Sequence, residues 1–352
     1  MGAVVSASHN PADDNGIKLL SARGSKLGSD VERELEDRLR SSGWQAATGG
    51  TIGYRTWNPD GLYDYLDHLA SAARYSLNGV RLALDCANGA AYKAAPELFE
   101  RLNADVVVFN AEPNGRNIND NCGATHPAFI AENGDGRIGL AFDGDADRLI
   151  AVDEDGETAN GDVIMAIIAR HLKEQGKLKK NLVVATVMSN LGFRKSMEEA
   201  GIEIVETPVG DRYVTEALLE RKGLLGGEQS GHIIFADLAE TGDGLLTAVQ
   251  LLNVVAGTGK ELRELRAEAM TEFPQVLVNV KIDRSIDIAA VEPLWDEVNE
   301  VEEELGDEGR VLVRPSGTEP LVRIMVEAPT KELASGYADR LAAVAEEATR
   351  KV

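Results

Sequence analysis

The chain has 352 residues, 43% of them hydrophobic, which is enough for several domains with buried cores. Its formal net charge of −23 disfavours a nucleic-acid partner, because phosphate backbones are bound by clusters of lysine and arginine. No apolar run is long enough to cross a bilayer, so no membrane partner is expected. Two cysteines, Cys86 and Cys122, are too few for a disulfide framework, and a cytoplasmic location is predicted.

The first motif along the chain is SASHNP, which contains Ser8 and His9. Two turn signals follow, Asn10-Pro11 and Asn15-Gly16, and they predict that the stretch folds back and brings Lys18 near the serine. A serine close to a base and a cation is a candidate nucleophile or phosphoryl carrier. A serine in an ordinary turn is the alternative interpretation.

Apolar, β-branched runs then alternate with segments of helical period. The expected strands are 80–85, 105–109, 138–142, 149–153, 182–187 and 202–206. The expected helices are 91–103, 160–175 and 211–221. This alternation favours α/β layers with largely parallel sheets. The Gly-, Thr- and Pro-containing stretch 48–61 is predicted to be a linker.

Between two of these strands lies DGDADR, with aspartates at Asp143, Asp145 and Asp147. Three carboxylates at every second position of a loop suit one hard divalent cation. An EF-hand is disfavoured, although Glu154 stands at its twelfth position, because Arg148 replaces the sixth-position glycine and the flanks are strands. A solvated acidic turn remains the alternative to a metal loop.

The segment GGEQSGH (226–232) places Glu228, Ser230 and His232 among glycines. Glycines allow a ligand to approach the backbone closely, and carboxylate and hydroxyl groups can bind the hydroxyls of a sugar. A glycine-rich turn without a ligand explains the segment equally well.

The C-terminal part is predicted to be an α+β module with strands 276–283, 311–315 and 321–328 and helices 288–304 and 331–349. Its RPSGTEP segment (314–320) offers a guanidinium, hydroxyls and backbone N–H groups to a phosphate, or else forms a plain hairpin. The segment GTGK (257–260) lacks the spacing of a nucleotide-binding loop. The remaining histidines, His68, His126 and His171, are isolated and are predicted to be structural or exposed.

Together, SASHNP, DGDADR, GEQSGH and RPSGTEP resemble the motifs of the α-D-phosphohexomutase superfamily in their order and spacing, and the resemblance covers the whole chain. It implies a multi-domain α/β fold of three mixed-sheet domains, the first truncated, followed by a C-terminal α+β domain. The implied domains are 1–55, 56–158, 159–269 and 270–352. Only seven residues precede Ser8, and family members carry a longer segment there. We therefore expect residues 1–55 to be a remnant of the first domain.

The resemblance also implies a role for each motif. The phosphoryl carrier would be Ser8. The next residue, His9, would also belong to the catalytic residues. Mg²⁺ would be held by Asp143, Asp145, Asp147 and an oxygen of phosphorylated Ser8. Proton transfer would fall to Lys18 and His232, and Arg148 would lie beside the phosphoserine. The sugar would be bound by Gly210, Asp211, Arg212, Glu228 and Ser230, and the non-reacting phosphate by Arg314, Ser316, Gly317 and Thr318.

Within the superfamily, GEQSGH and TPVGDRYV (207–214) most resemble the members that act on glucosamine phosphates. This implies a mutase that interconverts glucosamine 6-phosphate and glucosamine 1-phosphate through glucosamine 1,6-bisphosphate, for cell-wall amino-sugar synthesis. Three alternatives remain: a phosphomannomutase or phosphoglucomutase, a catalytically silent remnant that binds sugar phosphate, and a serine phosphatase with the same metal loop. The resemblance leaves a homodimer open.

Overall fold

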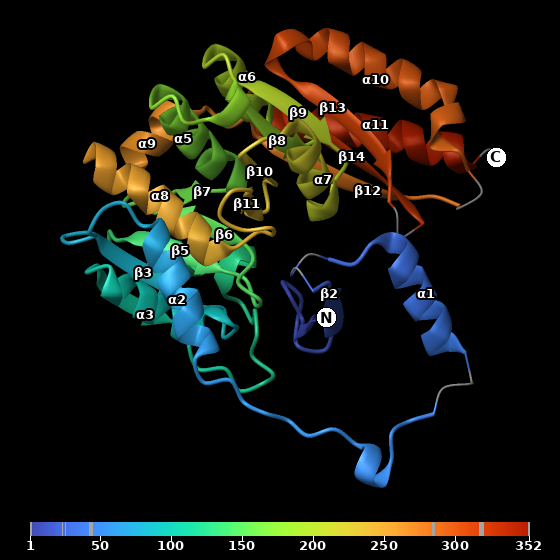
Figure 1. Cartoon of the computed structure of the whole chain (residues 1–352). Helices are drawn as coiled ribbons and strands as arrows, with labels where there is room; N and C mark the ends of the chain where they lie inside the picture. The colour runs from blue at the N-terminus through green and yellow to red at the C-terminus, as the bar shows by residue number, and fades with distance from the viewer. Residues whose placement is uncertain are drawn as a thin grey trace. The chain divides into compact units, whose positions relative to one another are not determined.

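The structure, a computed structural model, describes residues 2–22, 24, 26–41, 45–283, 286–316 and 320–350 (Figure 1). Their contacts define two compact units. The first unit contains the chain up to Met188 together with Ala200–Ala269. The second unit contains Ser189–Glu199 and the chain from Met270 onward.

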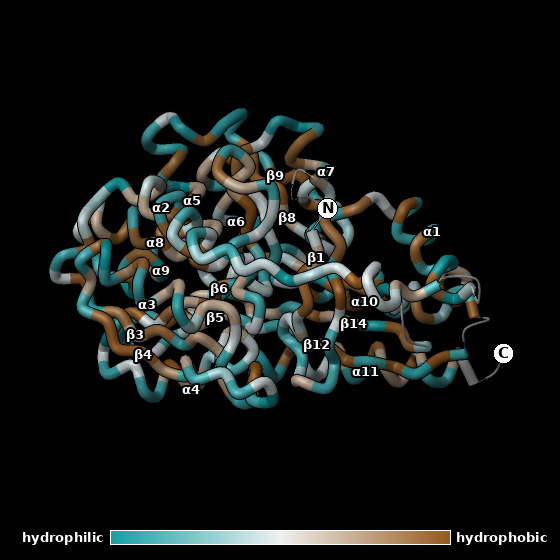
Figure 2. The backbone as a smooth tube through the Cα atoms, turned by 60° about the horizontal axis from the view of Figure 1, so that its bottom comes forward, coloured by the Kyte–Doolittle hydropathy of each residue, from teal (hydrophilic) through white to brown (hydrophobic). Residues whose placement is uncertain are grey.

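The first unit begins with a β-hairpin and a helix. Strand β1 (Gly2–Ser6) pairs antiparallel with β2 (Gly16–Leu20), and Val4 lies opposite Lys18. The predicted fold-back of this stretch is therefore confirmed. Helix α1 (Ser29–Arg40) follows, with an acidic first turn and a basic last turn that suit the helix dipole. Figure 2 shows apolar and polar residues alternating along α1, yet little of this apolar surface is covered.

A five-stranded sheet carries the next part of the chain in the order β4-β3-β5-β6-β7. Its strands are β3 (Arg81–Asp85), β4 (Asp105–Phe109), β5 (Ile138–Phe142), β6 (Leu149–Val152) and β7 (Thr158–Ala159). The first three are parallel and the last two antiparallel, so the predicted alternation is confirmed. Figure 2 shows the apolar character of β3 and β4. The associated helices are α2 (Gly61–Ala72), α3 (Ala91–Arg101) and α4 (Ala128–Asn133), with α4 packed against β3 and β5.

A four-stranded sheet completes the first unit, in the order β11-β10-β8-β9. Its strands are β8 (Leu182–Thr186), β9 (Glu203–Thr207), β10 (Leu225–Gly227) and β11 (Ile233–Phe235). Its helices are α5 (Gly161–Glu174), α7 (Asp211–Arg221), α8 (Gly244–Thr258) and α9 (Leu262–Ala269). Helix α8 is buried over most of its length, and α5 contacts both β6 and β10. The two sheets therefore share a helical layer.

The second unit contains the predicted α+β module and, in addition, helix α6 (Leu191–Glu199), a segment of the implied domain 159–269. The module comprises β12 (Gln275–Lys281), α10 (Glu292–Leu305), β13 (Arg310–Pro315), β14 (Leu321–Glu327) and α11 (Lys331–Arg350). The strands form an antiparallel sheet in the order β12-β14-β13, and α10 and α11 share an apolar core with it. The fully buried Glu327 accepts hydrogen bonds from Asn190, Gln275 and Arg310. This network joins α6 to the sheet.

The structure also bears on smaller features of the sequence. The GTGK segment is the end of α8, where Gly259 adopts a left-handed C-cap conformation. Both cysteines are buried and free. Among the described residues, no helix combines the length and the apolar character needed to cross a membrane.

Candidate active site

The acidic loop lies between two buried strands. Every residue of β5 and β6 is buried, so the polar residues between them are confined to the connecting turn. There the carboxylates of Asp143, Asp145 and Asp147 converge, with ligand atoms within 4.8 Å of one another. Asp143 is fully buried, which rules out a solvated acidic turn.

This carboxylate cluster has the donor set of a hard-metal site. Within the described residues, one buried oxygen of each aspartate lacks a hydrogen-bond partner: Asp143 Oδ2, Asp145 Oδ1 and Asp147 Oδ1. Unpartnered buried acceptors are costly unless a cation or proton compensates them. Carboxylate oxygens without nearby cysteine suit Mg²⁺ and disfavour zinc. The residues present therefore fit a magnesium ion.

Glu154 is engaged elsewhere in the fold. Its two carboxylate oxygens accept hydrogen bonds from the backbone N–H groups of Leu262 and Arg263, at the start of α9. It therefore caps a helix, as expected for a carboxylate at a helix N-terminus. The loop is not an EF-hand, as the flanking strands predicted.

The charges around the loop differ from one aspartate to the next. Burial, together with the negative charges of Asp147 and Asp145, raises the pKa of Asp143. Burial also opposes ionisation of Asp147, but His232, Lys18 and Arg148 outweigh it and lower the pKa of that carboxyl. The loop thus holds one carboxyl that resists ionisation and one that is stabilised as an anion.

Lys18 on β2 supplies the closest cation. Its Nζ lies 2.6 Å from Asp145 Oδ2 and 3.2 Å from Asp147 Oδ2. Partial burial of the ammonium opposes its charge, but the two carboxylates raise the pKa of Lys18 overall. The hairpin therefore places a stable positive charge against the acidic loop.

Ser8 lies in the loop that joins β1 to β2, with a left-handed φ of 53°. Its backbone N–H donates to Ser6 Oγ at 2.8 Å, and its carbonyl accepts from the Gly144 N–H at 3.1 Å. A Cβ atom at Gly144 would collide with the Ser8 carbonyl oxygen, so glycine is required for this close approach. The serine loop and the acidic loop are therefore in direct backbone contact.

The Ser8 hydroxyl faces its neighbour His9. Oγ lies 3.4 Å from His9 Nδ1, too far for a strong hydrogen bond. Burial and the positive charge of Arg148 lower the pKa of His9. A neutral imidazole beside a hydroxyl can accept its proton.

His232 reaches the acidic loop from the segment between β10 and β11. The Leu149 N–H donates to the Gly231 carbonyl at 3.1 Å, which ties this segment to the start of β6. His232 is buried, and its Nδ1 lies 3.4 Å from Asp147 Oδ1. Its Nε2 accepts from the Gly242 N–H at 3.2 Å, so the ring is held between this backbone group and the aspartate.

Arg148 ends the acidic loop. Its backbone N–H donates to Asp143 Oδ1 at 3.1 Å. Its side-chain Nε is buried, has no hydrogen-bond partner in the described part of the chain and lies 3.9 Å from Asp147 Oδ1. The guanidinium therefore keeps donors available for an anion.

The structure brings some of the predicted sugar-binding residues together. The Gly210 N–H donates to Glu228 Oε1 at 2.9 Å, which joins the start of α7 to the GEQSGH segment. Asp211 pairs with Lys26 and lies 3.8 Å from His232 Nε2. Arg212 pairs with Glu216, and Ser230 is exposed.

The predicted phosphate-binding residues belong to the second unit. Arg314 on β13 lies opposite Arg323 on β14. Burial and the neighbouring positive charge lower the pKa of Arg314. Ser316 follows β13, and Gly317 and Thr318 lie outside the described residues. Two guanidiniums on adjacent strands suit a bound anion.

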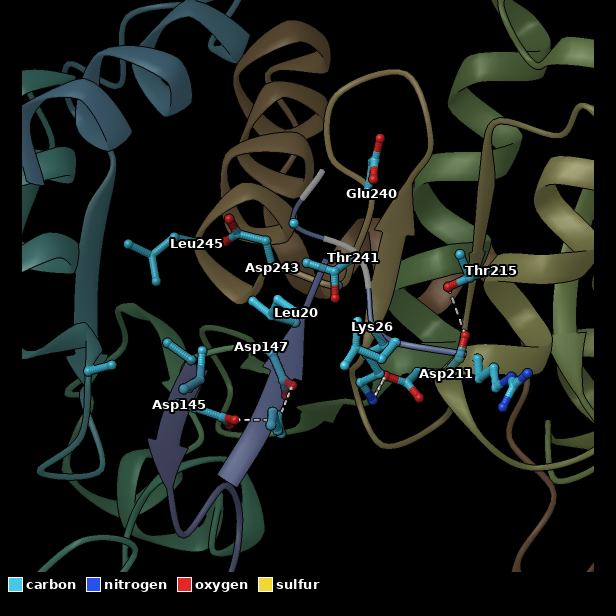
Figure 3. Close-up of a pocket in the computed structure, with 18 of the residues that line it drawn as sticks. Leu20, Lys26, Asp145, Asp147, Asp211, Thr215, Glu240, Thr241, Asp243 and Leu245 are labelled. Carbon is cyan, nitrogen blue, oxygen red and sulfur yellow. Dashed lines mark hydrogen bonds and ion pairs between the residues drawn. The ribbon is translucent and has the colours of Figure 1, made fainter. Parts of the chain in front are cut away.

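A cavity of about 490 Å³ lies beside the acidic loop in the first unit. Figure 3 shows Asp145 and Asp147 near one part of its wall and Asp211 with Lys26 near another. Tyr65 and Asp243 also line it, and the Tyr65 hydroxyl donates to Asp243, the N-cap of α8. The sequence did not indicate Lys26, Tyr65 or Asp243, because each lies outside a motif and acquires its neighbour from a distant segment.

This arrangement of α/β layers, a loop of carboxylates suited to a hard metal, a serine and several cations is that expected of a phosphoryl-transfer enzyme. The chain belongs to the phosphoglucomutase/phosphomannomutase family. Models of that family's alpha/beta/alpha domains I, II and III match residues 1–46, 63–156 and 160–273, and its C-terminal domain matches residues 277–344.

Similar proteins support this assignment. The phosphoglucosamine mutase of Anoxybacillus flavithermus is 51% identical over 98% of this chain and 78% of its own length. That of Bacillus subtilis is 49% identical over 97% of this chain and 78% of its own length. The chain thus spans about four fifths of these relatives.

Solved structures agree on the fold. Aspergillus fumigatus N-acetylphosphoglucosamine mutase, in complex with GlcNAc-6P and magnesium, matches with a TM-score of 0.77 at 22% identity, covering 99% of this chain and 89% of that one. A phosphoglucomutase/phosphomannomutase family protein from Burkholderia thailandensis matches with a TM-score of 0.78 at 23% identity, covering 98% and 76%. At these identities the likeness concerns the fold alone.

Proposed function

We propose that the protein is a phosphoglucosamine mutase, which interconverts glucosamine 6-phosphate and glucosamine 1-phosphate for cell-wall precursor synthesis. The observation that carries this proposal is the backbone contact between Ser8 and Gly144, because it joins a serine to the three-aspartate loop. The phosphoglucosamine mutases at about 50% identity support the choice of sugar.

In the proposed reaction, phosphorylated Ser8 transfers its phosphoryl group to the free hydroxyl of glucosamine 6-phosphate. The bond between phosphorus and the serine oxygen breaks, a bond to the sugar oxygen forms, the sugar hydroxyl proton passes to a base, and the serine oxygen takes up a proton. The resulting glucosamine 1,6-bisphosphate then returns its other phosphoryl group to Ser8: the serine hydroxyl gives up its proton, the bond between phosphorus and sugar oxygen 6 breaks, that oxygen is protonated, and glucosamine 1-phosphate is formed. No phosphate is lost, and the enzyme ends phosphorylated as it began.

The acidic loop would hold Mg²⁺ through Asp143, Asp145 and Asp147, with an oxygen of phosphorylated Ser8 completing the set. When bound, the ion neutralises charge on the transferring phosphoryl group. The chain itself supplies further positive charge from Lys18 and from Arg148, whose buried Nε keeps a free donor. Phosphoryl transfer depends mainly on such positioning and charge neutralisation.

The proton-transfer groups are proposed to be Lys18 and His232, and His9 lies beside the serine hydroxyl. His232 is held by the Gly242 N–H at Nε2, so its orientation is set before substrate binds. Lys18 is oriented by two carboxylates. Both groups therefore meet the requirement that a general acid or base be fixed in place.

The remaining assignments concern substrate binding, assembly and location. The sugar would be bound by Gly210, Asp211, Arg212, Glu228 and Ser230, and the non-reacting phosphate by Arg314, Ser316, Gly317 and Thr318. Four domains, 1–55, 56–158, 159–269 and 270–352, would share these tasks. The binding partner would be a small sugar phosphate. The proposed assembly is a homodimer. The two free thiols favour a cytoplasmic location.

The proposal is tested with Ser8→Ala. We expect isomerisation of glucosamine 6-phosphate to be lost while the thermal unfolding midpoint stays unchanged, because Ser8 contributes no buried apolar surface. Intact mass should detect one phosphoryl group on the wild type and none on the variant. Ser41→Ala, which removes an exposed hydroxyl from the same part of the chain, is the matched control.

Two outcomes would contradict the proposal. Undiminished turnover by Ser8→Ala would remove the serine from the mechanism. Stoichiometric release of inorganic phosphate by the wild type would instead indicate a serine phosphatase. A parallel assay with mannose and glucose phosphates distinguishes the related phosphomannomutase and phosphoglucomutase activities.

A further inference from the structure

Asn119 contacts the serine loop from an unexpected direction. It lies in the long connection that follows β4, more than a hundred residues from Ser8 in sequence. Its side-chain Nδ2 donates to the Ser8 carbonyl at 2.7 Å and to the Asn10 carbonyl at 2.8 Å. Its own backbone N–H donates to the Ala87 carbonyl at 2.9 Å, which anchors it beside β3. Both hydrogens of one amide are thus used on one short loop.

The orientation of this amide is determined by its surroundings. Asn119 is only 7% exposed, so its polar atoms depend on protein partners. Turning the amide over would place Oδ1 against two carbonyl oxygens and lose both hydrogen bonds. In the orientation present, Oδ1 is buried without a hydrogen-bond partner in the described part of the chain. Asn119 therefore keeps both hydrogen bonds to the serine loop although its Oδ1 has no hydrogen bond among the described residues.

The two carbonyls that Asn119 binds lie on either side of His9. The Ser8 carbonyl also accepts from the Gly144 N–H, so it is clamped between the Asn119 loop and the acidic loop. The Asn10 N–H donates to the Ala7 carbonyl and closes the turn. These bonds oppose relaxation of the left-handed conformation of Ser8, which a non-glycine residue rarely adopts.

The hairpin itself cannot hold the serine in place. Its side chains at Val5 and Ile17 are each 70% exposed, and a two-stranded ribbon is only marginally stable on its own. Orientation of the serine must therefore come from contacts with the neighbouring sheet. The Asn119 amide supplies two such contacts directly to the serine loop.

We infer that Asn119 is a positioning residue for Ser8, a role that rests on the proposed phosphoryl transfer by that serine. It touches neither the acidic carboxylates nor the hydroxyl by any hydrogen bond among the described residues. Its loss should therefore slow the transfer step and leave metal and substrate affinity unchanged. A serine displaced by about 1 Å is expected to transfer about a hundredfold more slowly.

The chain offers a matched control in Asn121. It lies two residues away in the same connection, also has a left-handed φ (54° against 57° for Asn119), and is exposed. Its Nδ2 donates to Asp120 and not to the serine loop. Replacing either asparagine by alanine therefore introduces the same backbone strain, and only Asn119→Ala removes the contacts to Ser8 and Asn10.

The first measurement is amide hydrogen exchange on the full chain, which requires no activity. Asn119→Ala should speed exchange at Asn10 and Gly144, whose N–H groups are bonded within and to the serine loop. Exchange in β3 and β5 should be unchanged, and Asn121→Ala should match the wild type. Unchanged exchange at Asn10, or equal acceleration in the strands, would overturn the inference.

The second measurement is the rate at which glucosamine 1,6-bisphosphate phosphorylates Ser8, followed by intact mass. Asn119→Ala should lower this rate about hundredfold and kcat likewise. KM, magnesium affinity and the unfolding midpoint should remain near the wild-type values. A fall in kcat accompanied by weaker magnesium binding or a lower unfolding midpoint would identify a purely structural residue and overturn the inference.

A second variant covers the case in which the alanine chain does not fold. Asn119→Asp keeps the side-chain shape and replaces the donor with a carboxylate oxygen that repels both carbonyls. Relative to Asn121→Asp, it should show the faster loop exchange and the lower kcat expected of Asn119→Ala. A wild-type activity of Asn119→Asp would overturn the inference. If wild-type Ser8 takes up no phosphoryl group, the proposed function fails. Faster exchange confined to the serine loop in Asn119→Ala would still show that Asn119 holds this loop in place.

Discussion

Within the first unit, the segment that carries Ser8 and the segment that carries the aspartates are stabilised in different ways. Among the described residues of 2–60, Ala7 is the only buried one. In contrast, every residue of β5 and β6, the strands that flank the aspartates, is buried. The serine is therefore held by polar contacts to backbone and carboxylate groups, and the acidic loop by a hydrophobic core.

This difference has a consequence for the chemistry. Apolar burial contributes about 25 cal/mol per Å² and is insensitive to exact geometry, so it keeps the acidic loop in place. Hydrogen bonds and ion pairs contribute less net stability but define direction. The reactive hydroxyl thus depends on a few directional contacts, whose removal should change activity more than stability.

The largest expected effect on stability separates the two segments. Leu84→Ala in β3 removes a fully buried side chain and should lower the free energy of unfolding by about 2–5 kcal/mol. Ile17→Ala in β2, where the side chain is 70% exposed, should change it by less than about 0.5 kcal/mol. Urea denaturation measures both. Equal losses of unfolding free energy at the two positions would contradict the distinction between the segments.

The next largest effect is expected on mutase turnover, at the contact between the two segments. Gly144→Ala would force a Cβ atom against the Ser8 carbonyl oxygen and to about 2.8 Å from Asn119 Nδ2. We expect about a hundredfold loss of mutase turnover from the resulting displacement. Gly50→Ala, where nothing lies within 4 Å of the added Cβ, should be neutral. Near-normal turnover in Gly144→Ala would show that this approach does not position the serine.

The smallest effect is specific to the acidic loop. Magnesium at about ten times its dissociation constant should raise the free energy of unfolding by about 1.4 kcal/mol, because only the folded loop gathers its ligands. Asp145→Asn should abolish this gain, and Asp296→Asn, which alters one exposed carboxylate on α10, should retain it. Calorimetric titration gives the affinity. Tight binding of zinc at this loop instead of magnesium would contradict the assignment of the metal.

Much of the fold could be predicted from local pattern. The runs at 105–109 and 138–142 are strands with the predicted limits, and the segment 211–221 is a helix with the predicted limits. These succeed because a strand or helix buried on one or both faces must show its periodicity in the sequence. Helices α1, α2, α4, α8 and α9 were not predicted. Of these, α1 covers no core, and α8 is apolar on nearly all sides and so lacks a clear polar face.

In the candidate site, too, local pattern predicted some features and not others. The sequence by itself determined which chemical groups are present, because DGDADR between two apolar runs confines three carboxylates to one turn. Only the tertiary structure decided which groups meet: Lys18 with Asp145, His232 with Asp147, and Asn119 with Ser8. Each of these contacts joins segments about 85 to 130 residues apart, and local periodicity carries no information on such distances. They form because the order of strands in the sheets brings these loops to one place.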